Sequence, residues 1–300
     1  MDALLLAQLC RASLDKSHEP EREVPWGTGP AEDGEPILPA ALLSLGGLPD
    51  AVARAPAPAL AALARHETAS MFSTFVRFEG FLNERLADWI TRARPGDGIA
   101  PYALHVIEEE ARHSRMFVHL LEELGVGGYP RRGGLGALEA LGMAAMRRSR
   151  LLFLLGMLGV EEISDAFFVR ILAAPRGHPV LRSVCRIHRI EESRHIEFAR
   201  QWLRESYAAA AGAERLLLRL LAPAILTLIF EVFVQPDVYR RAGLATSRRE
   251  GLRLWRRARR SPERAALRRE CSARVTRLLR EIGAIPRSTR PLWRAARLLA

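Results

Sequence analysis

Apolar residues recur at intervals of three and four along most of this chain from residue 59 onwards. In the first such stretch they fall at Met71, Phe72, Phe75, Val76, Leu82, Leu86 and Ile90. This spacing places them on one face of a helix, because an α-helix turns about 100° per residue. The strict alternation of apolar and polar residues that is typical of strands is scarce. The pattern therefore predicts an all-α protein.

Breaks in the apolar pattern divide the chain into helices. The first predicted helix starts near residue 59 and ends at the break Pro95–Gly98. Further helices are predicted over 101–124, 137–173, 180–210 and 214–234, and two or three amphipathic helices follow, separated near Ser261–Pro262 and Pro286. Helices of this length with short connections are typical of a four-helix bundle, here with additional C-terminal helices.

Composition divides the chain into three parts. Residues 1–58 are predicted to form an irregular N-terminal arm, because 18–58 are rich in proline, glycine and glutamate. Trp26 and the Ile37–Leu38 pair are candidate anchors of this arm. We expect residues 59–235 to form the helical-bundle domain. Residues 236–300 are expected to form a helical segment that packs on the bundle or extends it.

The chain shows no pattern of a secreted or membrane-spanning protein. Its first residues, MDALLLAQLC, contain no basic leader and only a short apolar run. The longest uncharged stretch within the predicted helices covers only 220–230, whereas a membrane-spanning helix needs about 20 residues. Three cysteines at unrelated positions argue against a disulfide framework or a thiolate zinc site. We therefore expect a cytoplasmic protein.

Positive charge is concentrated at the C-terminal end. The formal net charge is +11, yet residues 236–300 alone hold 19 arginines and five acidic residues. A solvated helix face is the simplest interpretation, and an anion-facing patch for an acidic partner or a membrane surface is the alternative. Nucleic acid is a poor fit, because Tyr239, Trp255 and Trp293 are the only aromatic residues of this segment and stacking platforms usually need more.

Two segments contain Glu-x-x-His on a predicted helix. Glu110 precedes His113 by three positions, and Glu192 precedes His195 by three. A step of three positions leaves two side chains about 60° apart, on one face of a helix. A single pair of this kind is a weak signal, because glutamate is common in helices.

The register of these pairs makes the signal stronger. The interval from Glu79 to Glu110 is the same as the interval from Glu161 to Glu192. That separation allows the chain to run along one helix, turn and return to the same level. Two such hairpins would bring four carboxylates and two imidazoles together. This is the ligand set of dinuclear iron and manganese carboxylate bundles.

Expected burial and spacing distinguish these candidate ligands from the acidic residues beside them. Glu79 shares a face with apolar residues, where an ionised carboxylate is costly unless it is paired or bound to a cation. Glu161 and Glu162 both follow an apolar run, and the repeated spacing favours Glu161. Glu108, Glu109 and Glu191 are interpreted as outer or solvated groups.

A third histidine extends the second pair. His188 precedes Glu192 by four positions and His195 by seven, which places the three side chains within about 60° of arc. A third imidazole could therefore bind one of the metals. The alternative is a partly buried histidine that is hydrogen-bonded to a carboxylate.

With these residues, the stretch 60–235 resembles the ferritin-like di-iron oxygenases, and specifically the p-aminobenzoate N-oxygenase (AurF-like) family, which carries His-x-x-x-Glu-x-x-His. The resemblance implies a ferritin-like core and a di-iron oxygenase that uses dioxygen and an external reductase or ferredoxin. It also implies an amine substrate and secondary metabolism. The metal ligands that it implies are Glu79, Glu110, His113, Glu161, His188, Glu192 and His195.

Other functions remain open. Manganese could replace iron, since carboxylate and imidazole ligands suit both metals. The same site could instead serve C–H hydroxylation, desaturation or peroxide handling. A non-enzymatic helical binding module, whose Glu/His pairs are ordinary ion pairs, is the further alternative. The arginine-rich end could dock a substrate tethered to an acidic carrier protein, and a homodimer is compatible with these features.

Overall fold

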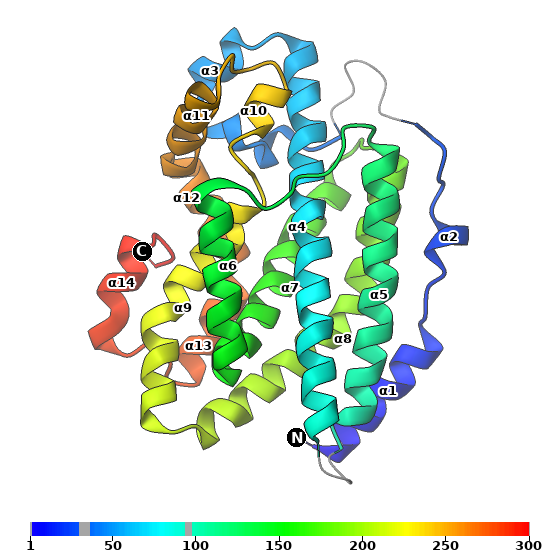
Figure 1. The fold of residues 1–300 in the computed structure, drawn as a ribbon, viewed down its shortest axis with the longest axis vertical. Coiled ribbons are helices and arrows are strands. Elements are labelled where there is room, and N and C mark those ends of the chain that lie inside the picture. Colours follow the sequence, from blue (N-terminus) through cyan, green and yellow to red (C-terminus); the bar gives the residue numbers. More distant parts are fainter. Residues whose placement is uncertain (1, 30–36, 94–97, 300) are drawn as a thin grey trace.

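The computed structural model describes residues 2–29, 37–93 and 98–299. These residues form helices connected by turns and contain no strand, so the all-α prediction is confirmed (Figure 1). The long helices are α4 (Ala57–Arg92), α5 (Ala100–Glu123), α6 (Gly133–Arg148), α7 (Arg150–Ala173), α8 (Pro179–Ala209) and α9 (Gly212–Val232).

Helices α4, α5, α7 and α8 form the central bundle, which confirms the ferritin-like core. α4 packs along α5, α7 packs along α8, and α5 contacts α8. Phenylalanine rings close the remaining side, because Phe72 of α4 stacks on Phe168 of α7 with ring centroids 5.8 Å apart. The apolar stripes of four helices therefore share one core.

Helix α7 is enclosed on all sides. Its residues from Leu151 to Asp165 are all buried, because α8, α9, α6, α12 and α13 pack around it. A helix that is apolar around its whole circumference has no face for solvent and belongs in a core. Any charged group between Leu151 and Asp165 must therefore find a partner inside the protein.

The prediction of one continuous helix over 137–173 is wrong, because α6 ends at Arg148 and α7 begins at Arg150. Ser149 separates them with an extended backbone (φ −131°, ψ 123°), and its hydroxyl accepts a hydrogen bond from the backbone N–H of Leu152. Serine is a favoured N-cap because its side chain satisfies a free N–H of the first turn. Neither glycine nor proline marks this break in the sequence.

The N-terminal segment is more regular than predicted. α1 (Ala3–Asp15) packs against α5 and α8, where irregular chain was expected. The remaining elements are short: α2 (Pro20–Glu23), η1 (Ala40–Leu42), η2 (Ser44–Gly47) and α3 (Pro49–Arg54). Trp26 stacks on His119 of α5 with ring centroids 3.8 Å apart. Ile37 and Leu38 are buried. The break predicted at Pro95–Gly98 lies largely outside the described residues.

The C-terminal segment forms more and shorter helices than the two or three expected. They are α10 (Val238–Arg241), α11 (Arg248–Arg260), α12 (Pro262–Cys271), α13 (Ala273–Glu281), η3 (Arg287–Thr289) and α14 (Arg290–Ala295). The break near Ser261–Pro262 is present, and the Ser261 hydroxyl accepts a hydrogen bond from the backbone N–H of Arg264. Within the described ranges, no helix has the length and apolarity needed to cross a bilayer.

A buried polar contact joins the N-terminal and C-terminal segments to the bundle. The carboxylate of Glu67 on α4 accepts hydrogen bonds from the backbone N–H and the hydroxyl of Ser44. The same hydroxyl lies 2.7 Å from the phenolic oxygen of Tyr239 on α10. Glu67 is enclosed, so the pKa of its carboxyl is raised to about 7, mainly by loss of solvation.

Candidate metal centre

All seven residues selected from the sequence lie buried between the four bundle helices. α4 carries Glu79, α5 carries Glu110 and His113, α7 carries Glu161, and α8 carries His188, Glu192 and His195. Their donor atoms form three overlapping groups in which the atoms of each group lie within 4.8 Å of one another. The groups are Glu79, His113 and His188; Glu110, Glu192 and His195; and Glu161, His188 and Glu192.

Two carboxylates occupy the middle of this cluster. Nδ1 of His113 lies 3.1 Å from an oxygen of Glu110 and 3.1 Å from an oxygen of Glu192. Nδ1 of His195 lies 3.0 Å from the second oxygen of each of the same two carboxylates. Glu110 and Glu192 therefore each face both imidazoles, the position from which a carboxylate can bridge two cations.

The outer nitrogens of the same imidazoles contact a second pair of carboxylates. Nε2 of His113 lies 2.8 Å from Glu191, and Nε2 of His195 lies 2.6 Å from Glu109. A carboxylate on one ring nitrogen holds the N–H there and directs the lone pair of the other nitrogen inward. Both imidazoles thus present Nδ1 to the centre of the cluster.

Each outer carboxylate is also held by an arginine. Arg112 of α5 donates to Glu191 of α8 at 3.1 Å, and Arg194 of α8 donates to Glu109 of α5 at 2.7 Å. Burial opposes ionisation of Glu191, but the bonds from His113 and Arg112 outweigh it and lower its pKa to about 2. Glu191 therefore stays ionised.

These outer contacts follow a repeat that is wider than Glu-x-x-His. Both helices read Glu-Glu-x-Arg-His, first at 109–113 and again at 191–195. The repeated Glu and Arg are the sequence signal for this outer pair, whose two glutamates were predicted only as outer or solvated groups. Glu108 faces solvent, with 71% of its side chain exposed.

His188 lies at the apolar end of the cluster. Its Nε2 lies 3.3 Å from Glu192 and 3.6 Å from Glu79, while its ring packs against Phe117 and Phe168 with centroids 5.2 Å away in each case. Loss of solvation lowers the pKa of His188 to about 4. The ring is therefore neutral near pH 7 and keeps a lone pair for a cation.

Among the described residues, no arginine lies at ion-pair distance from the other two carboxylates, those of Glu79 and Glu161. The pKa of Glu79 is held well above its ordinary value by burial and by the nearby Glu110. The pKa of Glu161 is raised in the same way by burial and by Glu192. Glu162 does not face the cluster, because Arg200 binds its carboxylate at 2.7 Å.

The donor set fits two divalent cations. Four carboxylates crowd together in a volume closed to water, an arrangement that is costly without cations. Oε1 of Glu110 and Oε1 of Glu192 lie 3.0 and 3.1 Å from imidazole Nδ1 atoms but make no well-oriented hydrogen bond, and Nδ1 of His188 has no hydrogen-bond partner among the described residues. Buried polar atoms without a partner are rare and indicate a missing ion or ligand. Oxygen and imidazole donors suit iron and manganese.

This chain is similar to known proteins over part of its length, and one family matches nearly all of it. The chain is 29% identical over 164 residues to an uncharacterized protein of Mycobacterium bovis, and equally so to uncharacterized proteins of two Mycobacterium tuberculosis strains. These matches cover 54% of this chain and 48% of each relative, so the similarity spans about half the length of the relatives. The family described as p-aminobenzoate N-oxygenase AurF matches residues 2–283. This chain therefore belongs to the p-aminobenzoate N-oxygenase AurF family.

Proposed function

We propose that this protein is a di-iron oxygenase that transfers oxygen from O2 to the nitrogen of an amine, with an arylamine as the favoured substrate class. The observation that carries the proposal is the convergence of four carboxylates and three imidazoles, all buried, from four helices. Membership of the AurF family supports the choice of nitrogen as the atom that is oxidised.

The residues that would hold the metals are the seven donors of the cluster. Glu110 and Glu192 would both help to hold the metals, because each faces both His113 and His195. His188 would complete the coordination beside Glu79. When bound, two iron ions supply the binding and reduction of dioxygen, with electrons from an external reductase or ferredoxin.

The protein's own groups set the charge and the orientation of this centre. Glu191 and Glu109 contact Nε2 of His113 and His195 and would hold a proton there, so that the lone pair of each Nδ1 would bind a metal ion. Phe117 and Phe168 cover His188 and keep water away from that side. Exclusion of water protects a reactive oxidant from side reactions.

Metal content is the first test of this proposal. Purified protein that is loaded anaerobically with iron(II) should hold about two iron ions per chain, as a dinuclear carboxylate centre requires. Glu161→Gln should lower the iron content, whereas Glu162→Gln should retain it, because only Glu161 faces the cluster. Protein that binds no stoichiometric iron would instead be a helical binding module.

The reaction is tested separately with the iron-loaded protein. Isotopically labelled O2, a chemical reductant and p-aminobenzoate should give a hydroxylamine, nitroso or nitro product that carries the label on nitrogen. A matched incubation with an alkyl substrate distinguishes the alternatives. Label found on carbon, or peroxide consumption without any organic product, would replace N-oxygenation by hydroxylation or peroxide handling at the same centre.

A further inference from the structure

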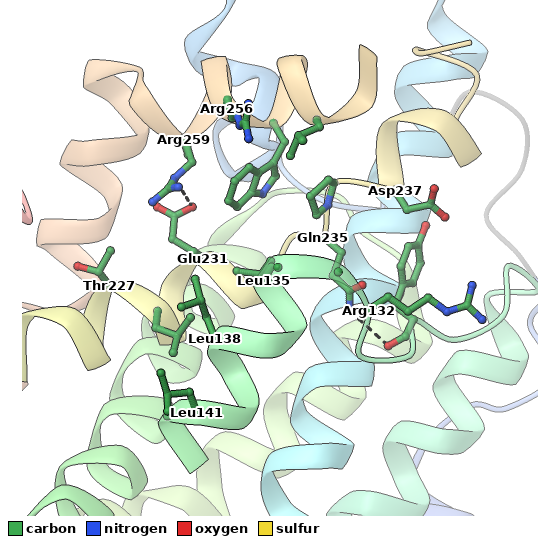
Figure 2. A pocket seen from close by; sticks show the side chains of 18 of the residues that line it. Arg132, Leu135, Leu138, Leu141, Thr227, Glu231, Gln235, Asp237, Arg256 and Arg259 are labelled. Atoms are coloured by element: carbon green, nitrogen blue, oxygen red, sulfur yellow. Dashed lines mark hydrogen bonds and ion pairs between the residues drawn. The ribbon is translucent and has the colours of Figure 1, made fainter. Parts of the chain in front are cut away.

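A large groove lies outside the metal centre, between α6, α9 and α11. It has a volume of about 1050 Å³, close to the upper end of the range of about 300–1,000 Å³ for small-molecule sites. Figure 2 shows Leu135, Leu138 and Leu141 of α6 facing it, with Thr227 and Glu231 of α9 beside them and Arg256 of α11 above. We call this the leucine–arginine groove.

The floor of the leucine–arginine groove is apolar and open to solvent. Leu138 is 54% exposed and Leu141 is 66% exposed, although both lie on the face of α6 that meets the groove. Leucines at a spacing of three on one helix face are normally covered. Leu221 and Leu228 of α9 and Leu252 of α11 extend the same surface. An apolar lining of this extent indicates a binding site.

The charges of the groove are unbalanced. Five arginines and two carboxylates line it. Both carboxylates already have partners: Glu231 is bound by Arg268 at 2.6 Å, and Asp237 is bound by Arg240 at 2.9 Å. Asp237 also pairs with Arg241 and Glu231 also pairs with Arg259, and both of these arginines line the groove.

Three arginines of the groove therefore remain for a ligand. Arg132 precedes α6, while Arg248 and Arg256 belong to α11 on the other side. Among the described residues, none of these three guanidinium groups has a carboxylate at ion-pair distance. All three are exposed. Guanidinium groups bind carboxylates and phosphates through several N–H donors. The mouth of the groove thus selects an anion.

The apolar lining continues behind α6. A cavity of about 40 Å³ shares Gly142, Ile225 and Leu228 with the groove, and Phe78 and Val160 form part of its inner wall. Phe78 and Val160 directly precede Glu79 and Glu161 in the chain. The apolar surface therefore extends from the open leucines towards the bundle core. This inner part suits the apolar end of an elongated ligand better than a second polar group.

We propose that the leucine–arginine groove binds a single-chain amphiphile, an extended alkyl chain with a terminal carboxylate. The alkyl chain lies on the leucines of α6 and α9, and the carboxylate binds at the rim, where Arg132 lies on one side and Arg248 and Arg256 lie on the other. This assignment does not depend on the oxygenase function, because it uses none of the metal-centre residues.

Dodecanoate, kept below its micelle concentration, is the probe. Calorimetric titration of the full chain should show saturable binding of one dodecanoate per protein. Dodecanol has the chain without the charge, acetate has the charge without the chain, and dodecyltrimethylammonium has the opposite charge. Each should bind at least about tenfold more weakly than dodecanoate if chain and charge both contribute about 1.4 kcal/mol or more.

Paired variants test the two halves of the groove. Leu138→Gln with Leu141→Gln, and separately Arg132→Gln with Arg256→Gln, should each weaken dodecanoate binding about tenfold or more. Leu104→Gln on α5 and Arg277→Gln on α13 are the matched controls, since Leu104 is 55% exposed and Arg277 is also exposed. The controls should retain the affinity. All substituted positions are exposed, so unfolding is not expected, and circular dichroism checks this.

Several results would overturn the proposal. Absence of saturable dodecanoate binding would do so, and so would equal affinities for dodecanoate, dodecanol and the cationic amphiphile. Equal losses in the control variants would show that general positive charge, rather than the groove, attracts the anion. If dodecanoate fails while a synthetic helical peptide with an acidic polar face binds, the groove is a protein interface.

Discussion

The carboxylate of Glu191 on α8 lies 2.8 Å from Nε2 of His113 on α5, across the interface of the two hairpins. Glu109 on α5 makes the equivalent contact to His195 on α8 at 2.6 Å. Each hairpin therefore orients the imidazole of the other. The two imidazoles of the candidate centre are held by the packing of α5 on α8, rather than by their own helices alone.

Glu191→Gln should weaken metal binding about 10- to 100-fold, because outer carboxylates orient the ligand imidazole and increase its basicity. Titration with manganese(II), followed by paramagnetic resonance, measures this affinity. Glu108→Gln is the matched control, since the Glu108 side chain is 71% exposed and is bound only at the surface by Arg112. Equal affinities for the two variants would show that Glu191 has no orienting role.

His188→Ala should retain the helical fold but lose metal at one site and, with it, oxygenase turnover. The imidazole is buried and faces Glu79 and Glu192, so its loss removes one donor. Iron content per chain and the rate of amine oxidation are measured together. His105→Ala, on the same helix as His113, controls for loss of a histidine. Full iron content and an unchanged rate in His188→Ala would contradict a ligand role.

Glu67 should make stability depend on pH. Its folded-state pKa of about 7 lies above the ordinary value of 4.5, so the folded protein binds this proton more tightly than the unfolded chain does. The stabilisation is complete below about pH 4.5 and is lost as the pH rises through about 7. The loss should amount to roughly 2–4 kcal/mol.

Urea unfolding at a series of pH values tests this dependence. Glu67→Gln should remove the fall in unfolding free energy between about pH 5 and pH 8. Glu84→Gln should leave the fall in place, because Glu84 is a half-exposed surface partner of Arg147. A wild-type profile that stays flat across this interval would show that Glu67 is not the group responsible.

Gly159→Val should destabilise the fold by about 1–3 kcal/mol, the usual effect of overpacking a core. A Cβ at Gly159 would meet Leu226 at 2.9 Å and Ile229 at 3.0 Å, both on α9. Gly80→Ala is the contrasting variant, because a Cβ there meets nothing within 4 Å and alanine is favoured within a helix by about 0.5–1 kcal/mol. Thermal unfolding should show a lower melting temperature for Gly159→Val and a higher one for Gly80→Ala than for the unchanged protein.

Periodicity and spacing were sufficient to predict most of the bundle. The predicted helices 101–124, 180–210 and 214–234 agree closely with α5, α8 and α9. The repeated interval between the two glutamates of each hairpin indicated which carboxylates share a level, because the constant rise of a straight helix fixes depth along it. It also separated Glu161 from Glu162, whose carboxylate is bound by Arg200.

Other features depend on contacts that spacing does not contain. In the sequence, Ser149 could stand inside a helix. In the structure, its hydroxyl caps the N-terminus of α7. The contact of Glu191 with His113 depends on how the two hairpins are rotated about their axes. The leucine–arginine groove arises from the packing of α11 beside α6 and α9. The helix α1 was missed because its residues were grouped with the proline-rich segment that follows them.

The crossed contacts of His113 and His195 also constrain the order of folding. They join residues 78 and 86 positions apart, so neither hairpin can assemble the centre alone. Closing such long loops is entropically costly and slow compared with helix formation. The polar cluster must therefore form after the hairpins have docked, and a nascent chain that ends before residue 195 has no complete centre to protect or to load.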